Sequence, residues 1–253
     1  MTDQRIRANL NLYAVLKNLE DLVAYDSEMG AFAKDWDISV QFVVHRGPKA
    51  CIVFKNASCI VEQGTRDAST VMLFFISPGH LNKMMDGKGT PIPLRGFSKL
   101  RFLTQEFSKL TDKLEYFLKP TDELLENPLY LELNTRMMLN TAAFSVPHIG
   151  ALDPVGKLVA PGIQNGTVQI TIAPDGPSVY IRFADGLIEA GKGLADQPTA
   201  IMSMRNMMVA NDFLNCKSDP FTAIASGDVT IKGQTPMLDA LSLILDRIPV
   251  YLS

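Results

Sequence analysis

The stretch VQFVVHRGPKACIVF at residues 40–54 decides the fold, because VQITIAPDGPSVYIRF at residues 168–183 repeats its pattern. One inserted residue in the turn brings the two into register, so that Val-Gln, Gly-Pro, an Ile and the closing Phe coincide. Two apolar runs around a Gly-Pro turn are typical of a β-hairpin, in which glycine supplies a positive φ and proline removes a ladder donor. The sequence therefore predicts two similar hairpins.

The similarity extends beyond the hairpins at a constant offset of 129 residues. It matches Phe54 with Phe183, Gly64 with Gly193, Asp67 with Asp196 and Thr70 with Thr199. Further along, the stretch that begins at Gly96 aligns with the one that begins at Gly227. The preserved order and spacing favour an internal repeat over two unrelated β meanders that share common turn residues.

Apolar alternation predicts four strands in each copy. They cover residues 38–44, 50–54, 58–63 and 70–76 in the first copy and residues 167–172, 178–183, 187–190 and 199–204 in the second. A short helix follows in each copy, at residues 80–85 and 206–214, then one more strand and a closing helix. Helical stripes at residues 12–23 and 129–143 precede the two copies. Each copy thus reads as helix, four-strand meander, helix, strand and helix.

The predicted fold class is α+β, with two tandem two-layer domains, each a mainly antiparallel five-stranded sheet with helices on one face. Pro120 ends the first closing helix, since proline cannot continue a helix. We therefore expect a divergent first domain at residues 1–121 and a second, better-matching domain at residues 122–253.

Composition excludes several function classes. The net charge of −3 gives no global attraction to nucleic acid, and no run of 18 apolar residues is present to span a bilayer. No signal-peptide pattern is evident at the N-terminus, and three irregularly spaced cysteines suit a reducing cytosol better than a disulfide framework. We expect a cytoplasmic protein without integral membrane contact.

The tail ASGDVTIKGQTPMLDALSLIL at residues 225–245 resembles the closing segment of sterol carrier protein 2 domains. In that family a Gly-x-x-x-Ile-x-Gly strand precedes an apolar helix. Upstream, Asp196 and Thr199 are similar to the Asp-x-Thr strand that feeds the family's short helix. The first copy departs from this pattern, since Leu103 stands near the place of the second glycine of the strand.

The resemblance implies a shell of sheet and helices around an apolar tunnel. Family members bind sterols, fatty acids, acyl-CoA or other lipids and have no catalytic residues of their own. For this chain it implies non-catalytic binding or transfer of a fatty acid, acyl-CoA, sterol or isoprenoid-like ligand. We expect no cofactor, no metal and no nucleic acid as partners of this chain, and a homodimer is left open.

Methionine is abundant where each short helix meets its sheet, and this flexible side chain suits pockets for varied apolar ligands. The candidate ligand-binding residues are Leu73, Phe75, Leu81, Met84, Met85, Phe107, Met202, Met204, Met207, Met208, Phe213, Leu214, Phe221, Met237 and Leu241. The second copy is expected to hold the better pocket because its motif is more complete. Alternatively, these residues fill ordinary cores.

Two other functions are open on the sequence. In a scaffold or interaction protein, the same apolar faces would pack between copies and no ligand would bind. An acyl-thioester enzyme would need Cys59 beside His45 or His80, and a buried, inert cysteine is the simpler interpretation. The three histidines, His148 included, have no partner at metal-ligand spacing and are expected at the surface or in turns.

Overall fold

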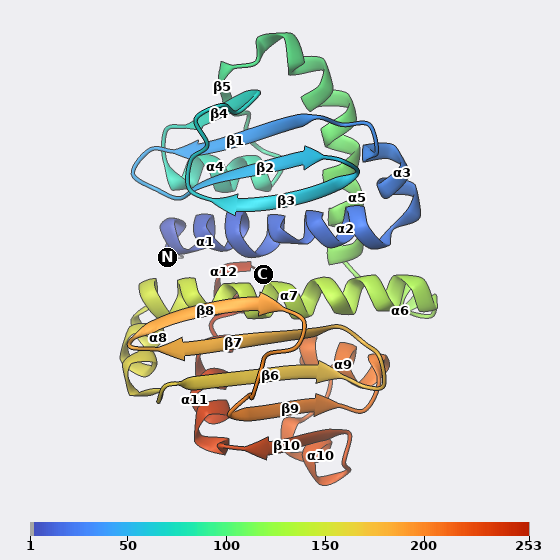
Figure 1. Ribbon diagram of the computed structural model, residues 1–253, viewed down its shortest axis with the longest axis vertical. Coiled ribbons are helices and arrows are strands. Elements are labelled where there is room, and N and C mark those ends of the chain that lie inside the picture. The colour runs from blue at the N-terminus through green and yellow to red at the C-terminus, as the bar shows by residue number, and fades with distance from the viewer. Residues whose placement is uncertain (1–2, 253) are drawn as a thin grey trace. The chain divides into compact units, whose positions relative to one another are not determined.

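The computed structural model describes residues 3–252, which fall into two compact units. Unit 1 extends to Lys119, and unit 2 begins at Pro120. Each unit contains a five-stranded sheet of its own with its own helices, as Figure 1 shows. The fold is α+β with mostly antiparallel sheets, and this part of the sequence prediction is confirmed.

Unit 1 opens with a helical segment that changes pitch. It consists of α1 (Gln4–Leu10), a π-helical turn (Asn11–Val15), a 3-10 turn (Leu16–Asn18), α2 (Leu19–Tyr25) and α3 (Ser27–Ala33). The strands are β1 (Ile38–Val44), β2 (Lys49–Lys55), β3 (Ser58–Gln63), β4 (Val71–Phe75) and β5 (Ile92–Arg95), with α4 (Pro78–Met85) before β5. The closing helix starts as a 3-10 turn (Phe97–Lys99) and a π-helical turn (Phe102–Phe107) and continues as α5 (Ser108–Leu118).

Unit 2 opens with α6 (Asp122–Leu125) and the long helix α7 (Pro128–Leu152), followed by α8 (Pro154–Val159) and a 3-10 turn (Ala160–Gly162). Its strands are β6 (Gly166–Ile172), β7 (Ser178–Ala184), β8 (Leu187–Lys192), β9 (Ala200–Met204) and β10 (Val229–Gly233). The helices α9 (Met207–Leu214) and α10 (Pro220–Ala225) lie between β9 and β10, and α11 (Thr235–Leu245) and α12 (Ile248–Leu252) end the unit.

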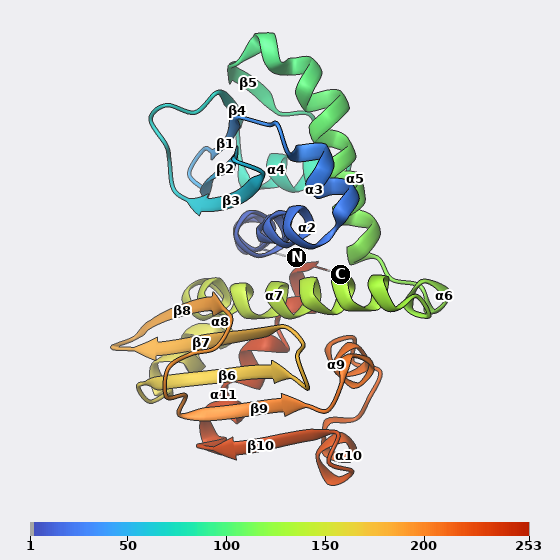
Figure 2. The ribbon, with the colours of Figure 1, turned by 45° about the vertical axis from the view of Figure 1, so that its right-hand side comes forward.

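Both sheets have the same strand order, and it is not the expected meander. The order is β3-β2-β1-β4-β5 in unit 1 and β8-β7-β6-β9-β10 in unit 2 (Figures 1 and 2). The fourth strand crosses to the far side of the first and pairs with it in parallel. Alternation of apolar residues sets the face of each strand but not its neighbour, so the sequence pattern could not reveal this crossover.

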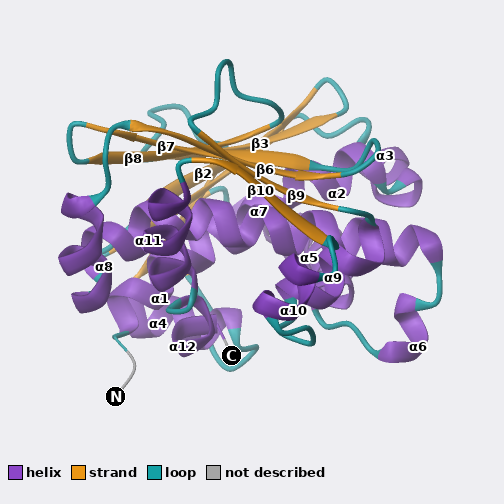
Figure 3. Ribbon diagram, turned by 90° about the horizontal axis from the view of Figure 1, so that it is seen from below, coloured by secondary structure: helices purple, strands orange, loops and turns teal. Residues whose placement is uncertain are grey.

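The helices of each unit gather on one face of its sheet, as Figure 3 shows. On the covered face, apolar side chains at every second strand position are buried because successive residues of a strand point to opposite faces. In unit 1 these are Val40, Phe42, Val44, Ile52, Phe54, Val71, Leu73 and Phe75, and in unit 2 they are Val168, Ile170, Ile172, Val179, Ile181, Phe183, Ala200 and Met204.

The hairpin turns use glycine for a different reason from the one expected. The positive φ in the β1–β2 turn belongs to Arg46, at 52°, and not to Gly47. A Cβ on Gly47 would lie 2.7 Å from Cγ1 of Val44, and one on Gly176 would lie 2.8 Å from Cβ of Ile172. Glycine is therefore required in both turns by close packing against the preceding strand.

The last strand of unit 1 lies earlier than expected. Residues 97–99 form a 3-10 turn, and β5 ends at Arg95, just before Gly96. Gly96 has a φ of +83° and packs against the Thr70 carbonyl, as Gly233, with a φ of +84°, packs against the Thr199 carbonyl. Gly96 thus corresponds to Gly233, and its alignment with Gly227 was wrong.

A buried glutamine on the central strand closes each sheet in the same way. The amide nitrogen of Gln41 donates to the carbonyl oxygens of Phe42, Ala50 and Gly64. Gln169 donates to the corresponding carbonyl oxygens of Ile170, Val179 and Gly193. The side-chain oxygens accept from the backbone N–H of Arg66 and Ala195, respectively. Each glutamine thereby ties the hairpin to the start of the crossover.

The buried carboxylate of Asp153 fixes the end of unit 2. It caps α8 by accepting from the N–H groups of Val155 and Gly156, and it also accepts from Tyr251 at 2.5 Å and Arg247 at 3.3 Å. Burial alone would raise the pKa of Asp153, but these hydrogen bonds to the charged form outweigh it and hold the pKa below its usual value. The cluster anchors α12 to the start of α8.

Candidate ligand-binding site

At the β10 edge of the unit 2 sheet, part of the apolar face is exposed to solvent. Met202 lies on β9 between Ala200 and Met204 and on the same face, and it pairs with Ile231 of β10. Ala200 and Met204 are fully buried, whereas Met202 and Ile231 are partly exposed. An apolar strip formed by Met202 and Ile231 on the helix-covered face of β9 and β10 is therefore partly exposed to solvent.

The short helix α9 forms one wall beside this strip and is held by a buried amide. Nδ2 of Asn211 donates to Oδ1 of Asn134 at 2.6 Å and to Oγ1 of Thr135 at 2.9 Å, both on α7. In unit 1, Asn82 of α4 occupies the equivalent position, 129 residues earlier, and bonds Gln4 and Asn11. Both short helices are thus fixed to the unit's leading helix by an asparagine.

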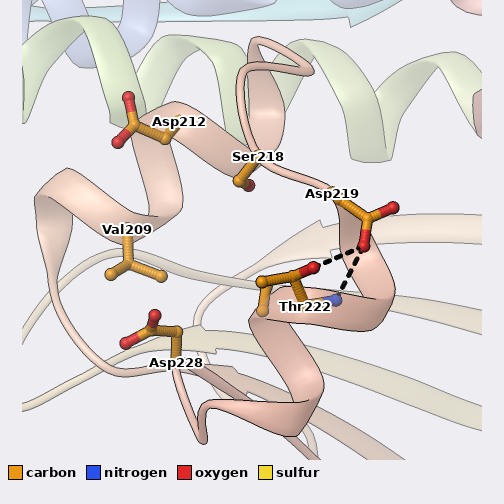
Figure 4. Close-up of a pocket in the computed structure, with 7 residues that line it drawn as sticks. Val209, Asp212, Ser218, Asp219, Thr222 and Asp228 are labelled. Carbon is orange, nitrogen blue, oxygen red and sulfur yellow. Dashed lines mark hydrogen bonds between the residues drawn. The ribbon is translucent and has the colours of Figure 1, made fainter.

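A surface hollow of about 220 Å³ opens between α9 and α10 (Figure 4). It is lined by Val209, Asp212, Ser218, Asp219, Thr222, Ala223 and Asp228. Figure 4 shows the carboxylate of Asp219 accepting from the backbone N–H and the hydroxyl of Thr222, and these bonds lower the pKa of Asp219. None of these lining residues was a sequence candidate.

One of the three carboxylates that line this hollow forms an ion pair. Arg205 forms an ion pair with Asp228 at 2.9 Å, and Ser226 donates to the other oxygen of Asp228. Among the residues that the structure describes, no group of three His, Cys, Asp or Glu side chains is arranged to hold a metal ion. The hollow therefore offers a small polar rim beside the apolar strip.

The predicted site residues separate into three groups. Seven lie in the cores of the two units: Leu73, Phe75, Leu81, Phe107, Met204, Met237 and Leu241. Six are partly exposed: Met84, Met85, Met202, Met207, Phe213 and Leu214. Two are well exposed: Met208 at 65% and Phe221 at 83%. The partly exposed group is the one placed to meet a ligand, and its role stays a prediction.

Unit 1 fills the corresponding position. Leu73 takes the place of Met202, since Leu73 pairs with Phe42 as Met202 pairs with Ile170, and Leu73 is only 4% exposed. The rings of Phe42 and Phe75 stack nearby at 6.1 Å. Trp36 adds an aromatic cluster, since its ring lies edge-on to Phe32, Phe54 and Phe102. The matching position in unit 1 is thus occupied by a buried leucine, and the core of that unit also contains the aromatic cluster around Trp36.

Sequence reasoning missed the buried polar residues that position these elements. Gln41 and Gln169 were matched as part of Val-Gln, but no role was assigned to them. Asn82 and Asn211 stand at the same 129-residue offset as the other repeat positions. A polar residue retained at that offset inside an apolar helix was the signal that could have identified them.

The histidines and cysteines show no catalytic arrangement in the described residues. The ring of His45 lies against Phe74 and that of His80 against Phe75, whereas Cys59 is buried in β3. His148 is not in a turn as expected: it lies within α7, and burial lowers its pKa to about 4. A helical position beside Pro147 was not suggested by the local sequence, because proline usually ends a helix.

No protein-family profile and no curated protein sequence matches the chain. Solved structures of sterol carrier protein 2 and similar domains match it, each over about two fifths of its length. A protein described as a UbiJ-SCP2 ubiquinone synthesis protein is 12% identical, with 40% of this chain and 86% of that chain covered and a TM-score of 0.33. A sterol carrier protein 2-like 2 from Aedes aegypti is 15% identical, with 42% and 95% covered and a TM-score of 0.31.

A different solved protein also matches, the inverting sec-alkylsulfatase Pisa1 from Pseudomonas sp.. It is 13% identical, with 58% of this chain but only 29% of that chain covered and a TM-score of 0.26. At these identities and TM-scores the similarities carry no inference about ligand or activity.

Among the described residues, no helix is long and apolar enough to cross a membrane.

Proposed function

We propose that the chain binds an extended apolar ligand without catalysis, and that the ligand enters unit 2 over Met202 and Ile231, on the helix-covered face of β9 and β10. The observation that carries this is the partial exposure of Met202 on a face whose neighbouring positions, Ala200 and Met204, are fully buried. The side chains of Met207, Phe213 and Leu214 on α9 are likewise partly exposed. An alkyl chain or fused ring system inserted there would cover this surface.

The energetics favour such a ligand over a polar one. Burying a methylene group contributes about 0.8 kcal/mol, so an acyl chain of about twelve carbons gains several kcal/mol without any polar contact. Methionine adapts to ligands of different shape because it is unbranched and polarizable.

We further infer that residues 1–121 and 122–253 are two copies of one domain, of which the second keeps the ligand site. The shared strand order, the glutamines Gln41 and Gln169 and the asparagines Asn82 and Asn211 support this. In the first copy, Leu73 and the aromatic cluster fill the space, so that copy has a structural role. The ligand classes are fatty acid, acyl-CoA, sterol or isoprenoid-like molecules.

Native mass spectrometry of the purified chain, followed by organic extraction, tests the proposal. We expect a co-purified lipid mass that is lost on extraction, or a mass shift when fatty acid, acyl-CoA or sterol is added. A chain that purifies without ligand and binds none of these three classes would overturn ligand binding and favour the scaffold alternative.

A pair of variants tests the location of the site. Met202→Lys places a charge on the apolar strip and should lower uptake at least tenfold, because a charged group is costly to bury beside an alkyl ligand. Leu187→Lys is the matched control, since Leu187 is 69% exposed on β8 of the same sheet. A cooperative thermal unfolding transition is the check that each variant is folded. If a folded Met202→Lys variant binds as the unmodified chain does, the ligand enters elsewhere.

A further inference from the structure

A stretch of unit 1 combines positive charge with a lack of acidic residues. Residues 87–105, here named the basic segment, read GKGTPIPLRGFSKLRFLTQ and connect α4 to the closing helix. The segment contains Lys88, Arg95, Lys99 and Arg101 and no Asp or Glu, in a chain whose net charge is −3. All four cationic residues are exposed. The segment is therefore a local positive feature of an acidic protein.

The same segment exposes large apolar side chains. Ile92 is 42% exposed, Leu94 52%, Phe97 62% and Leu100 39%. Single exposed apolar residues are common on protein surfaces, but four within nine residues are a feature that marks interaction sites. The segment thus presents apolar and cationic groups together.

The fold holds these side chains outward on an ordered backbone. β5 is the four-residue edge strand of its sheet, so within the described residues one side of it has no strand neighbour (Figure 1). Its pairing with β4 is also interrupted by a register shift. Gly96, with a φ of +83° and close to the Thr70 carbonyl, then turns the chain into the 3-10 turn that contains Phe97. Arg95 further anchors the segment by donating to the carbonyl oxygens of Asp67 and Ser69.

The charges of the basic segment are not neutralised from within the unit. Arg95 bonds only backbone carbonyls, and Nε of Arg101 donates to the neutral side chain of Gln105 at 2.9 Å. In the part of the chain that the structure describes, neither these two residues nor Lys88 and Lys99 form an ion pair with a carboxylate. Within the described part of unit 1, none of these four positive charges is therefore paired with a carboxylate.

Unit 2 provides an internal comparison. Its equivalent connection, residues 215–234, also exposes apolar side chains, with Phe221 at 83% and Ile224 at 42%. It carries two cations, Lys217 and Lys232, and two anions, Asp219 and Asp228. Apolar exposure is common to both connections, whereas a net positive charge belongs to that of unit 1 alone.

We propose that the basic segment docks the protein onto an anionic lipid surface. Apolar side chains flanked by Lys and Arg are suited to the boundary between headgroups and acyl chains, where the rings and aliphatic groups enter and the cations meet lipid phosphates. Nucleic acid would use the cations but not four exposed apolar side chains. Membrane docking by unit 1 does not depend on ligand binding by unit 2, so an experiment can refute either proposal and leave the other standing.

Sedimentation of the full chain with phosphatidylcholine vesicles, with and without phosphatidylserine, tests this docking. We expect binding only when phosphatidylserine is present, and weaker binding in high salt, because the screening length falls from about 10 Å at 0.1 M to about 3 Å at 1 M ionic strength. Equal binding to both vesicle types, or to neither, would overturn the proposal. Capture by polyanions or acidic proteins in place of vesicles would do the same.

Variants assign the effect to the segment. Each Lys or Arg near an anionic surface contributes roughly fivefold to partitioning, so Lys99→Gln with Arg101→Gln should weaken vesicle binding roughly 25-fold. Phe97→Ser should also weaken it, whereas Phe221→Ser, at the equivalent connection of unit 2, should not. Lys34→Gln with Lys157→Gln removes two exposed charges elsewhere and controls for net charge. Equal losses in the two double variants would refute a role specific to the basic segment.

Discussion

Replacing Gln169 by glutamate should weaken unit 2 in a pH-dependent way. The amide nitrogen of Gln169 lies 2.8 Å from the carbonyl oxygen of Val179, 3.1 Å from that of Gly193 and 3.3 Å from that of Ile170. In Gln169→Glu an oxygen that cannot donate takes its place and faces three acceptors. Because only 2% of Gln169 is exposed, water cannot relieve the repulsion.

The expected loss follows from the bonds that disappear. Each amide–carbonyl hydrogen bond contributes about 0.5–1.5 kcal/mol to stability. A buried acceptor that is left without a donor costs about 1–3 kcal/mol. The free energy of unfolding of unit 2 should therefore fall by about 3–5 kcal/mol at neutral pH. Burial and the neighbouring carbonyl oxygens raise the pKa of the introduced carboxyl above its unfolded value. The folded variant then binds the proton more tightly, so the deficit shrinks as the pH is lowered and grows as it is raised.

Urea unfolding at two pH values, with hydrogen exchange read separately for the strands of each unit, measures this loss. Separate readouts are needed because two units can unfold independently. Gln41→Glu should produce the same effect in unit 1, and Gln63→Glu, at an exposed position on β3, is the control. If Gln169→Glu changes stability by less than about 0.5 kcal/mol at neutral pH, as surface changes do, the assigned role of the glutamine is wrong.

Two further predictions concern α7 and the helix that packs on it. Asn211→Ala removes the hydrogen bonds to Asn134 and Thr135, so it should lower stability by about 2–3 kcal/mol and speed hydrogen exchange in α9 more than in β6. If α9 exchanges as slowly in the variant as in the unmodified chain, the Asn211 amide does not hold the helix. His148 is neutral when folded, with a pKa of about 4, so the unfolded chain takes up its proton first as the pH falls. Stability should therefore decrease by about 3 kcal/mol between about pH 6.5 and 4, and His148→Gln should remove this part of the acid sensitivity in urea titrations.

The sequence by itself determined the local elements and their apolar faces. β1 and β3 begin and end where alternation predicts, and Leu12 and Leu19 of the helical stripe at residues 12–23 are buried as expected. Period-two and period-3.6 patterns are properties of neighbouring residues, so they can be read without knowing the fold. The constant 129-residue offset likewise anticipated that the two sheets would have corresponding strands.

Only the tertiary structure decided which strands pair and which apolar residues reach solvent. The parallel pairing of β1 with β4 joins residues about thirty positions apart, and no local pattern specifies it. Leu73 and Met202 are both apolar at matching strand positions, yet one is buried and the other is partly exposed. Burial is a property of the neighbours that folding brings together, so the candidate site became visible only in three dimensions.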